Sequence, residues 1–155
     1  MIELFGSALV VLLADQLTKN FVLHTFFPNQ SKIAVPHVLW WTFVQNQRGA
    51  FGLFGDSEFW LIVMAIIVLG IFYWAFRDLA RRSALVRVAF GAIVVGAFGN
   101  ILDRLNHHYV IDFIDLRWWP VFNVADSCIT IGVAVLLLAS LRRGARSAAP
   151  TPELR

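Results

Sequence analysis

The sequence predicts an α-helical integral membrane protein with four transmembrane helices and a small extracytoplasmic β-sheet. Of its 155 residues, 59% are hydrophobic and only 15% are charged, and the mean hydropathy is +0.70. A soluble domain carries about 25% charged residues, so this chain has too little charge for a surface that faces water. Disordered chains are polar and highly charged, which excludes that class as well. The single cysteine excludes a disulfide framework and a zinc site built from cysteines.

Four long apolar stretches supply the predicted membrane helices. A helix needs about 20 mostly apolar residues to cross the hydrocarbon core of a bilayer. Asp15 and Lys19 interrupt the first stretch, which also lacks a basic leader, so we interpret it as a retained helix rather than a cleaved signal peptide. We expect residues 1–146 to form one membrane-embedded domain and residues 147–155 to form a disordered cytoplasmic tail. The stretches cover about residues 4–23, 59–76, 85–102 and 122–141.

The basic residues predict how these helices are oriented. Eight of the 13 lysines and arginines lie in the turn between the second and third helices or in the tail. The positive-inside rule then places both termini in the cytoplasm, and about residues 24–58 and 103–121 outside. The net charge of +3 is then accounted for by arginines that face the cytoplasm, and we expect no nucleic-acid partner. The eight residues are Arg77, Arg81, Arg82, Arg87, Arg142, Arg143, Arg146 and Arg155.

The first outer segment has the composition of a β-strand at one point. Residues Val38 to Gln45 read VLWWTFVQ and are rich in aromatic and β-branched side chains. Because the run is apolar on both faces, we expect a small sheet that lies on the membrane surface. Trp118 and Trp119 in the second outer segment fit the aromatic belt of a membrane interface.

Polar residues of four segments fall at a single depth, the outer edge of the bilayer. Ionisable groups inside a membrane are costly and usually mark a functional site. The alternative for each residue is structural: ion pairs between helices, interhelical amide hydrogen bonds, or a cap at the start of the fourth helix. Pairing alone does not require so many carboxylates at one depth. The residues are Asp15, Lys19, Asn100, Asp103, Arg104, Asn123 and Asp126, with Asp112 in the loop between the last two helices.

Several chemistries are conceivable for this cluster. A thiol or hydroxyl nucleophile at Ser127 or Cys128 would need a histidine base, and only His107 and His108 in the preceding loop are near in sequence. A metal site built from the two histidines and Asp112 is weakly supported, since no HExxH spacing occurs. Two neighbouring carboxylates fit better, because one keeps a proton while the other can take a proton from water. Such a pair suits peptide-bond hydrolysis.

Five motifs, in order along nearly the whole chain, resemble those of the bacterial lipoprotein signal peptidases (signal peptidase II). Together they are far more specific than any one alone. Arg48 stands where the family usually has glycine, Gly49 where it has alanine, and Val95 replaces the first glycine of a usual G-G-A. The motifs are DQLTK from Asp15, VQNQRGAFGLF from Val44, GAFGNILDR from Gly96, VIDFI from Val110 and FNVADSCITIG from Phe122.

The resemblance implies an aspartic endopeptidase of the bacterial inner membrane that needs no metal or cofactor. Its substrate would be a diacylglyceryl-modified prolipoprotein, cut just before the lipidated cysteine, and the cyclic peptide globomycin would inhibit it. The catalytic residues would be Asp112 and Asp126, and Asp103 is the carboxylate that would replace Asp112 if that assignment failed. We expect a monomer surrounded by membrane lipid. The supporting or substrate-binding residues would be Asp15, Lys19, Asn46, Asn100, Asp103, Arg104, Asn123 and Ala125.

Two other functions compete with this one. A channel or non-catalytic membrane subunit would carry polar residues through both leaflets, whereas the inner halves of these helices are almost entirely Val, Ile, Leu and Ala. A lipid phosphatase or related hydrolase would need a cationic cradle for phosphate, and only Lys19, Arg48 and Arg104 are available near the cluster.

Overall fold

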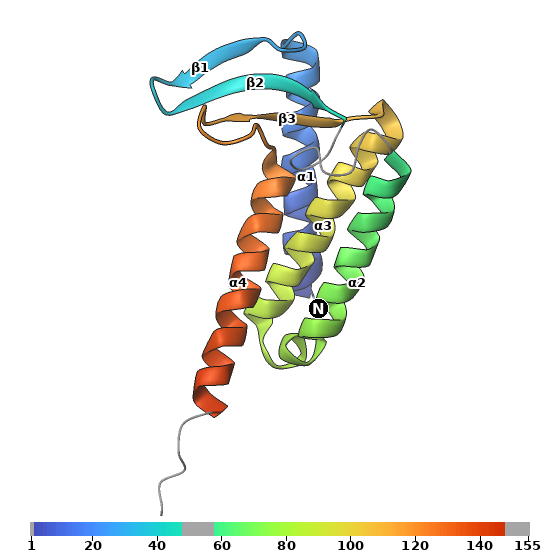
Figure 1. Ribbon diagram of the computed structural model, residues 1–155, viewed down its shortest axis with the longest axis vertical. Coiled ribbons are helices and arrows are strands. Elements are labelled where there is room, and N and C mark those ends of the chain that lie inside the picture. Colours follow the sequence, from blue (N-terminus) through green and yellow to red (C-terminus); the bar gives the residue numbers. More distant parts are fainter. Residues whose placement is uncertain (1, 48–57, 148–155) are drawn as a thin grey trace, which may run out of the picture.

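The computed structural model describes residues 2–47 and 58–147. In this part of the chain, four long helices run roughly alongside one another and a three-stranded sheet lies across one end of them (Figure 1). Arg48 and the tail after Ser147 lie outside the described residues. The elements are α1 (Ile2–Thr25), β1 (Ser31–Val35), β2 (Leu39–Asn46), α2 (Glu58–Arg82), α3 (Ala84–His107), β3 (Val110–Asp115) and α4 (Val124–Ser147).

Each predicted apolar stretch corresponds to a helix. Among the described residues, α2, α3 and α4 are long and apolar enough to cross a membrane. Helix α1 has 24 residues but carries Asp15 and Lys19, and it does not belong to that group. Three of the four predicted crossings are therefore supported, and the crossing by α1 stays a prediction.

The helix boundaries differ from the prediction at the arginine-rich turn. Helix α2 continues six residues beyond its predicted stretch, to Arg82, and α3 begins at Ala84, so that Ser83 alone separates them. Arg77 and Arg81 lie within α2, and Arg87 lies in the first turns of α3, rather than in a loop. The Ser83 hydroxyl accepts a hydrogen bond from the backbone N–H of Val86 at 3.4 Å, which caps α3.

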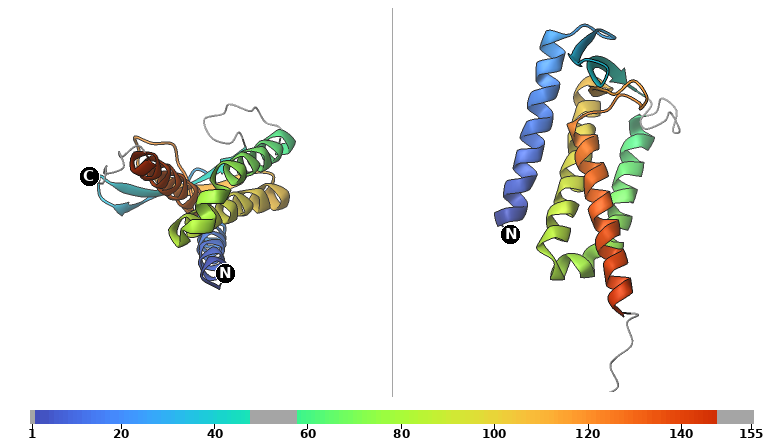
Figure 2. Two further views of the ribbon diagram at one scale, coloured as in Figure 1. Left: turned by 90° about the horizontal axis from the view of Figure 1, so that it is seen from below. Right: turned by 90° about the vertical axis from the view of Figure 1, so that its left-hand side faces the viewer.

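Helix α3 occupies the centre of the bundle and packs against α1, α2 and α4 (Figure 2). Glycines bring α3 and α4 close together. A Cβ atom on Gly96 would lie 2.8 Å from the carbonyl oxygen of Ala125, and one on Gly132 would lie 2.8 Å from that of Ala89. Small residues of this kind permit tight helix packing in a membrane, where no hydrophobic effect drives helices together.

The sheet has the antiparallel order β1-β2-β3. Strand β2 confirms the predicted strand with a shift of one residue, but β1 and β3 were not predicted. In particular, Asp112 lies in a strand, β3, and not in the predicted loop. Within β3 it pairs in register with Val44 of β2. Beneath the sheet, an apolar cluster anchors α1 to β2 and β3; its buried members are Val22, Phe26, Phe43, Ile111 and Phe113.

Candidate active site

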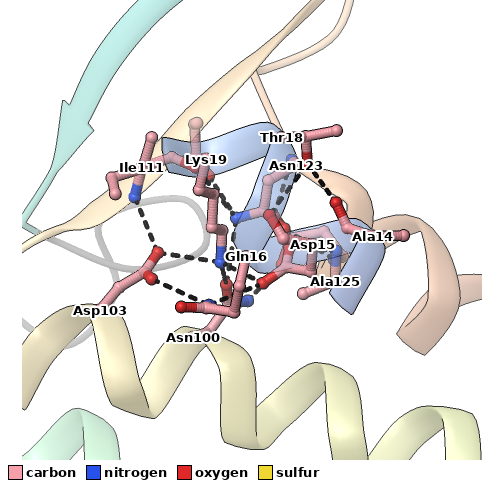
Figure 3. Close-up of polar contacts among 12 residues, drawn as sticks. Ala14, Asp15, Gln16, Thr18, Lys19, Asn100, Asp103, Ile111, Asn123 and Ala125 are labelled. Atoms are coloured by element: carbon pink, nitrogen blue, oxygen red, sulfur yellow. Dashed lines mark hydrogen bonds and ion pairs between the residues drawn. The ribbon is translucent and has the colours of Figure 1, made fainter. Parts of the chain in front are cut away.

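The ten predicted site residues come together where the sheet meets the helices. They derive from every element except β1 and α2, and they belong to one polar network, of which Figure 3 shows the part around Lys19. Helix α1 contributes Asp15 and Lys19; α3 contributes Asn100, Asp103 and Arg104; β2 and β3 contribute Asn46 and Asp112; Asn123, Ala125 and Asp126 lie at the start of α4.

Asp112 is almost completely buried, with 1% of its surface exposed. One carboxyl oxygen accepts a hydrogen bond from the Asn46 side-chain amide, and the other accepts one from the Asn123 amide, each at 2.8 Å. Burial, reinforced by the nearby charge of Asp126, raises the pKa of Asp112 from 3.8 to about 8. Near neutral pH this carboxyl group therefore holds a proton.

Asp126 lies in the first turn of α4 and forms a reciprocal cap with Asn123. The Asn123 side-chain oxygen accepts from the backbone N–H of Asp126 at 2.9 Å, and the Asp126 carboxylate accepts from the backbone N–H of Asn123 at 3.3 Å. The predicted capping role of these two residues is thus present. Asp126 also accepts a hydrogen bond of 2.8 Å from the Asn100 amide. The positive end of the helix dipole faces this carboxylate.

Asn123 joins the two aspartates. Its side chain is fully buried, and its amide nitrogen lies 2.8 Å from Asp112 and 3.0 Å from the side-chain oxygen of Asn100. Since Asn100 in turn donates to Asp126, a chain of amides connects the two carboxyl groups. The helix cap formed by Asn123 and Asp126 therefore does more than stabilise the start of α4, because it also orients the two aspartates relative to each other.

A buried lysine forms ion pairs with two carboxylates behind this aspartate pair. Lys19 is 1% exposed, and its ammonium nitrogen lies 2.8 Å from Asp15, 2.8 Å from Asp103 and 2.9 Å from the Asn100 side-chain oxygen. The predicted pairing of Asp15 with Lys19 is confirmed. Asp103 also pairs with this lysine, which the sequence did not reveal. Gln16 was likewise missed, although it stands inside the DQLTK motif and donates to Asp15 at 3.1 Å.

The two carboxylates that bind Lys19 also hold backbone groups in place. Asp15 accepts from the backbone N–H of Ala125 at 2.9 Å, and Asp103 accepts from the backbone N–H of Ile111 at 3.1 Å. These are the residues immediately before Asp126 and Asp112. The ion cluster therefore fixes the backbone at both aspartates without contacting their side chains.

Asp112 and Asp126 line the same cavity of about 310 Å³, together with Asn46, Asn100 and Arg104. A second, mostly apolar cavity of about 330 Å³ lies beside it and shares Asp126, Trp119 and Phe122 with it. Trp118, 77% exposed, and Ile131, 65% exposed, extend this apolar surface toward the outside of the bundle. Two carboxyl groups in a polar cavity thus lie beside a mostly apolar cavity that opens to the outside of the bundle.

The structure gives little support to the other chemistries. The Ser127 hydroxyl donates to the backbone oxygen of Asn123 at 3.0 Å, and the His107 ring stacks on Tyr109. Within residues 2–47 and 58–147, no three His, Cys, Asp or Glu side chains converge in a way that could hold a metal ion.

Three apolar helices of membrane-crossing length, packed around a buried cluster of carboxyl and amide groups, are typical of an integral membrane protein with a functional site at that cluster. The family model for signal peptidase (SPase) II matches residues 7–142. The chain belongs to this family, and it is a peptidase of the membrane.

Relatives and solved structures agree with this assignment. The lipoprotein signal peptidase of Syntrophomonas wolfei is 40% identical over 143 residues, covering 92% of this chain and 95% of the relative. That of Moorella thermoacetica is 40% identical over 129 residues, covering 83% and 86%. A solved bacterial membrane enzyme superposes with a TM-score of 0.86 at 29% identity over 97% of this chain and 94% of its own. Another has a TM-score of 0.79 at 32% identity, over 89% and 92%.

Proposed function

We propose that the chain is a membrane aspartyl endopeptidase that removes the signal peptide from diacylglyceryl-modified prolipoproteins, cutting just before the lipidated cysteine. One observation carries the proposal: a buried carboxyl group with a raised pKa, Asp112, shares a cavity with a second carboxylate, Asp126. Membership of the signal peptidase II family and the names of the relatives support the choice of substrate.

The two aspartates would divide the acid and base roles. Asp126 takes a proton from a water molecule as the water oxygen attacks the scissile carbonyl carbon, and Asp112 donates its proton to the carbonyl oxygen. The tetrahedral intermediate then collapses: Asp126 passes its proton to the leaving nitrogen, the C–N bond breaks, and Asp112 recovers its proton from the hydroxyl. Both carboxyl groups return to their starting states.

The remaining residues would support this pair. Asn46, Asn100 and Asn123 orient the carboxyl groups through the hydrogen bonds described above, while Arg104 lines the cavity where a substrate backbone would lie. Asp15, Lys19 and Asp103 would position the backbone at both aspartates. Ala125 would leave room beside the two aspartates, because its fully buried side chain is only a methyl group.

A lipid-anchored substrate requires a site that it can reach from the bilayer. The apolar cavity beside Asp126 would receive the diacylglyceryl group, with its exposed tryptophan at the membrane interface. With α1 as a fourth crossing helix, the arginines at the far end would face the cytoplasm, together with both termini, and the sheet and active site would lie at the outer face of the bacterial inner membrane. The protein would act as a monomer.

The test is cleavage of a diacylglyceryl-modified prolipoprotein by purified protein in detergent. Asp112→Asn and Asp126→Asn should still fold, judged by a cooperative thermal unfolding transition, and release no signal peptide. Asp78→Asn, a matched change at an exposed site at the other end of the bundle, should cleave normally. Globomycin should block the wild type.

Two results would contradict the proposal. If both aspartate variants cleave, the catalytic pair is misassigned, and Asp103→Asn is the next variant to examine. If the wild type leaves the lipidated substrate intact, then the substrate class is wrong whatever the aspartates do.

A further inference from the structure

A second polar feature lies at the end of the bundle away from the sheet. The last turns of α2 and the first turns of α3 enclose a cavity of about 220 Å³ that the peptidase chemistry does not use. Its walls combine three aromatic rings with three cationic side chains. The rings are those of Tyr73, Phe76 and Phe90, and the cations are Arg77, Arg81 and Arg87.

The positive charge at this cavity is largely uncompensated. Asp78 is the single acidic residue between positions 70 and 95, and it lies 3.8 Å from Arg81, with both side chains exposed. Such a surface pair is weak. Arg87 donates one hydrogen bond to the backbone oxygen of Ala80 at 3.1 Å, and Arg77 lies 5.9 Å from the ring of Trp74. Each of these guanidinium groups keeps further N–H donors for an anion.

The surroundings of the cavity are apolar and exposed. Trp74 is 70% exposed, Tyr73 is 58% exposed, and Ile71, one turn back along α2, is 60% exposed. In a membrane these side chains face acyl chains, while the arginines lie at the level of the headgroups. A ligand with a phosphate and adjoining hydrocarbon chains would match both parts of this surface.

We propose that this cavity binds one anionic phospholipid, with its phosphate held by Arg77, Arg81 and Arg87 and its acyl chains along the aromatic wall of α2. Guanidinium groups bind phosphate through paired hydrogen bonds. Basic pockets between membrane helices are a known mode of headgroup recognition. The aromatic lining favours a lipid over free phosphate, which would leave the apolar walls uncovered.

The proposal concerns a site remote from the aspartates, so its test does not use cleavage. Purified protein in detergent would be titrated with dioleoylphosphatidylglycerol or dioleoylphosphatidylcholine, and bound lipid would be counted by native mass spectrometry. The test variant is Arg77→Gln with Arg81→Gln, both at exposed side chains. The matched control is Arg142→Gln with Arg143→Gln, which removes two exposed arginines of α4 outside the cavity.

We expect the wild type to retain one phosphatidylglycerol in clear preference to phosphatidylcholine. A surface arginine near an anionic lipid contributes about 1 kcal/mol, or about fivefold in affinity, so the test variant should bind about 25-fold more weakly. The control should bind phosphatidylglycerol as the wild type does.

Three outcomes would overturn the site. Equal retention of the two lipids by the wild type would show that no headgroup is recognised, whatever the variants do. An equal loss in the control variant would show a general attraction between basic residues and anionic lipid. Displacement of the lipid by millimolar inorganic phosphate or glycerol 3-phosphate would show that the arginines bind phosphate without the acyl chains.

Discussion

Replacing Asp112 by asparagine should make the stability of the protein less dependent on pH, in addition to abolishing cleavage. The folded protein keeps the Asp112 proton up to about pH 8, whereas an exposed aspartate in the unfolded chain releases it near pH 3.8. Between these values the native state binds more protons than the unfolded state, so the free energy of unfolding falls as the pH rises. An asparagine cannot titrate, and the variant loses this contribution.

The size of the effect follows from the shift in pKa. Each pH unit within the window from 3.8 to about 8 costs the wild type about 1.4 kcal/mol of stability, or on the order of 4 kcal/mol from about pH 5 to about pH 8. For a chain of this size, that corresponds to a shift on the order of 10 °C in Tm. An asparagine amide and a protonated carboxyl group form different hydrogen bonds, and this changes the stability by the same amount at every pH. The change in stability between about pH 5 and about pH 8 is therefore unaffected by it.

Thermal unfolding in detergent, followed by tryptophan fluorescence across this pH range, measures the effect. The Tm of Asp112→Asn minus that of the wild type should grow steadily with pH, because titrating groups remote from Asp112 cancel in the comparison. The control is Asp78→Asn, which changes an exposed carboxylate and should show no such growth. Parallel pH profiles for the wild type and Asp112→Asn would refute the view that a buried, protonated carboxyl group faces the cavity.

Further outcomes are expected elsewhere in the site. Lys19→Met leaves Asp15 and Asp103 buried without their cation, which should cost about 3–5 kcal/mol in thermal unfolding; an unchanged Tm would contradict the ion cluster. Gly99→Ala places a Cβ atom 2.7 Å from an Asp15 oxygen and should cost about 1–3 kcal/mol and slow cleavage, whereas Gly70→Ala, with open space around it, should do neither. EDTA should leave the cleavage rate unchanged; a loss restored by added metal would argue against catalysis by aspartates alone.

The clustering of the polar residues could be predicted from the sequence because of the cost of leaving such groups in hydrocarbon. Polar side chains at one depth of a membrane must satisfy each other, and those on α1, α3 and α4 do so. The spacing of Asp15 and Lys19 placed them on one helix face, and they form an ion pair. Sequence spacing does not give the rotation of one helix against another, so the contact between Lys19 and Asp103 could not be foreseen.

The sheet was harder to predict for a different reason. Strand β2 is rich in aromatic and β-branched residues, but β3 reads VIDFID, and aspartate is disfavoured in strands. Its two aspartates are tolerated because each has partners: Asn46 and Asn123 for Asp112, and Thr42, at 2.7 Å, for Asp115. These partners come from other elements. Local sequence therefore favoured a loop where the fold places a buried strand.

The buried lysine explains how the amides near the aspartates keep their orientation. An ammonium group can only donate hydrogen bonds, and all three donors of Lys19 are used by Asp15, Asp103 and Asn100. The side-chain oxygen of Asn100 must therefore face the lysine, which turns its NH₂ group toward Asp126. The same oxygen accepts from Asn123, so the amide of Asn123 is oriented as well and presents its NH₂ group to Asp112. Lys19 thus determines which hydrogen-bonding groups face both carboxyl groups, although all of its own hydrogen bonds go to other residues.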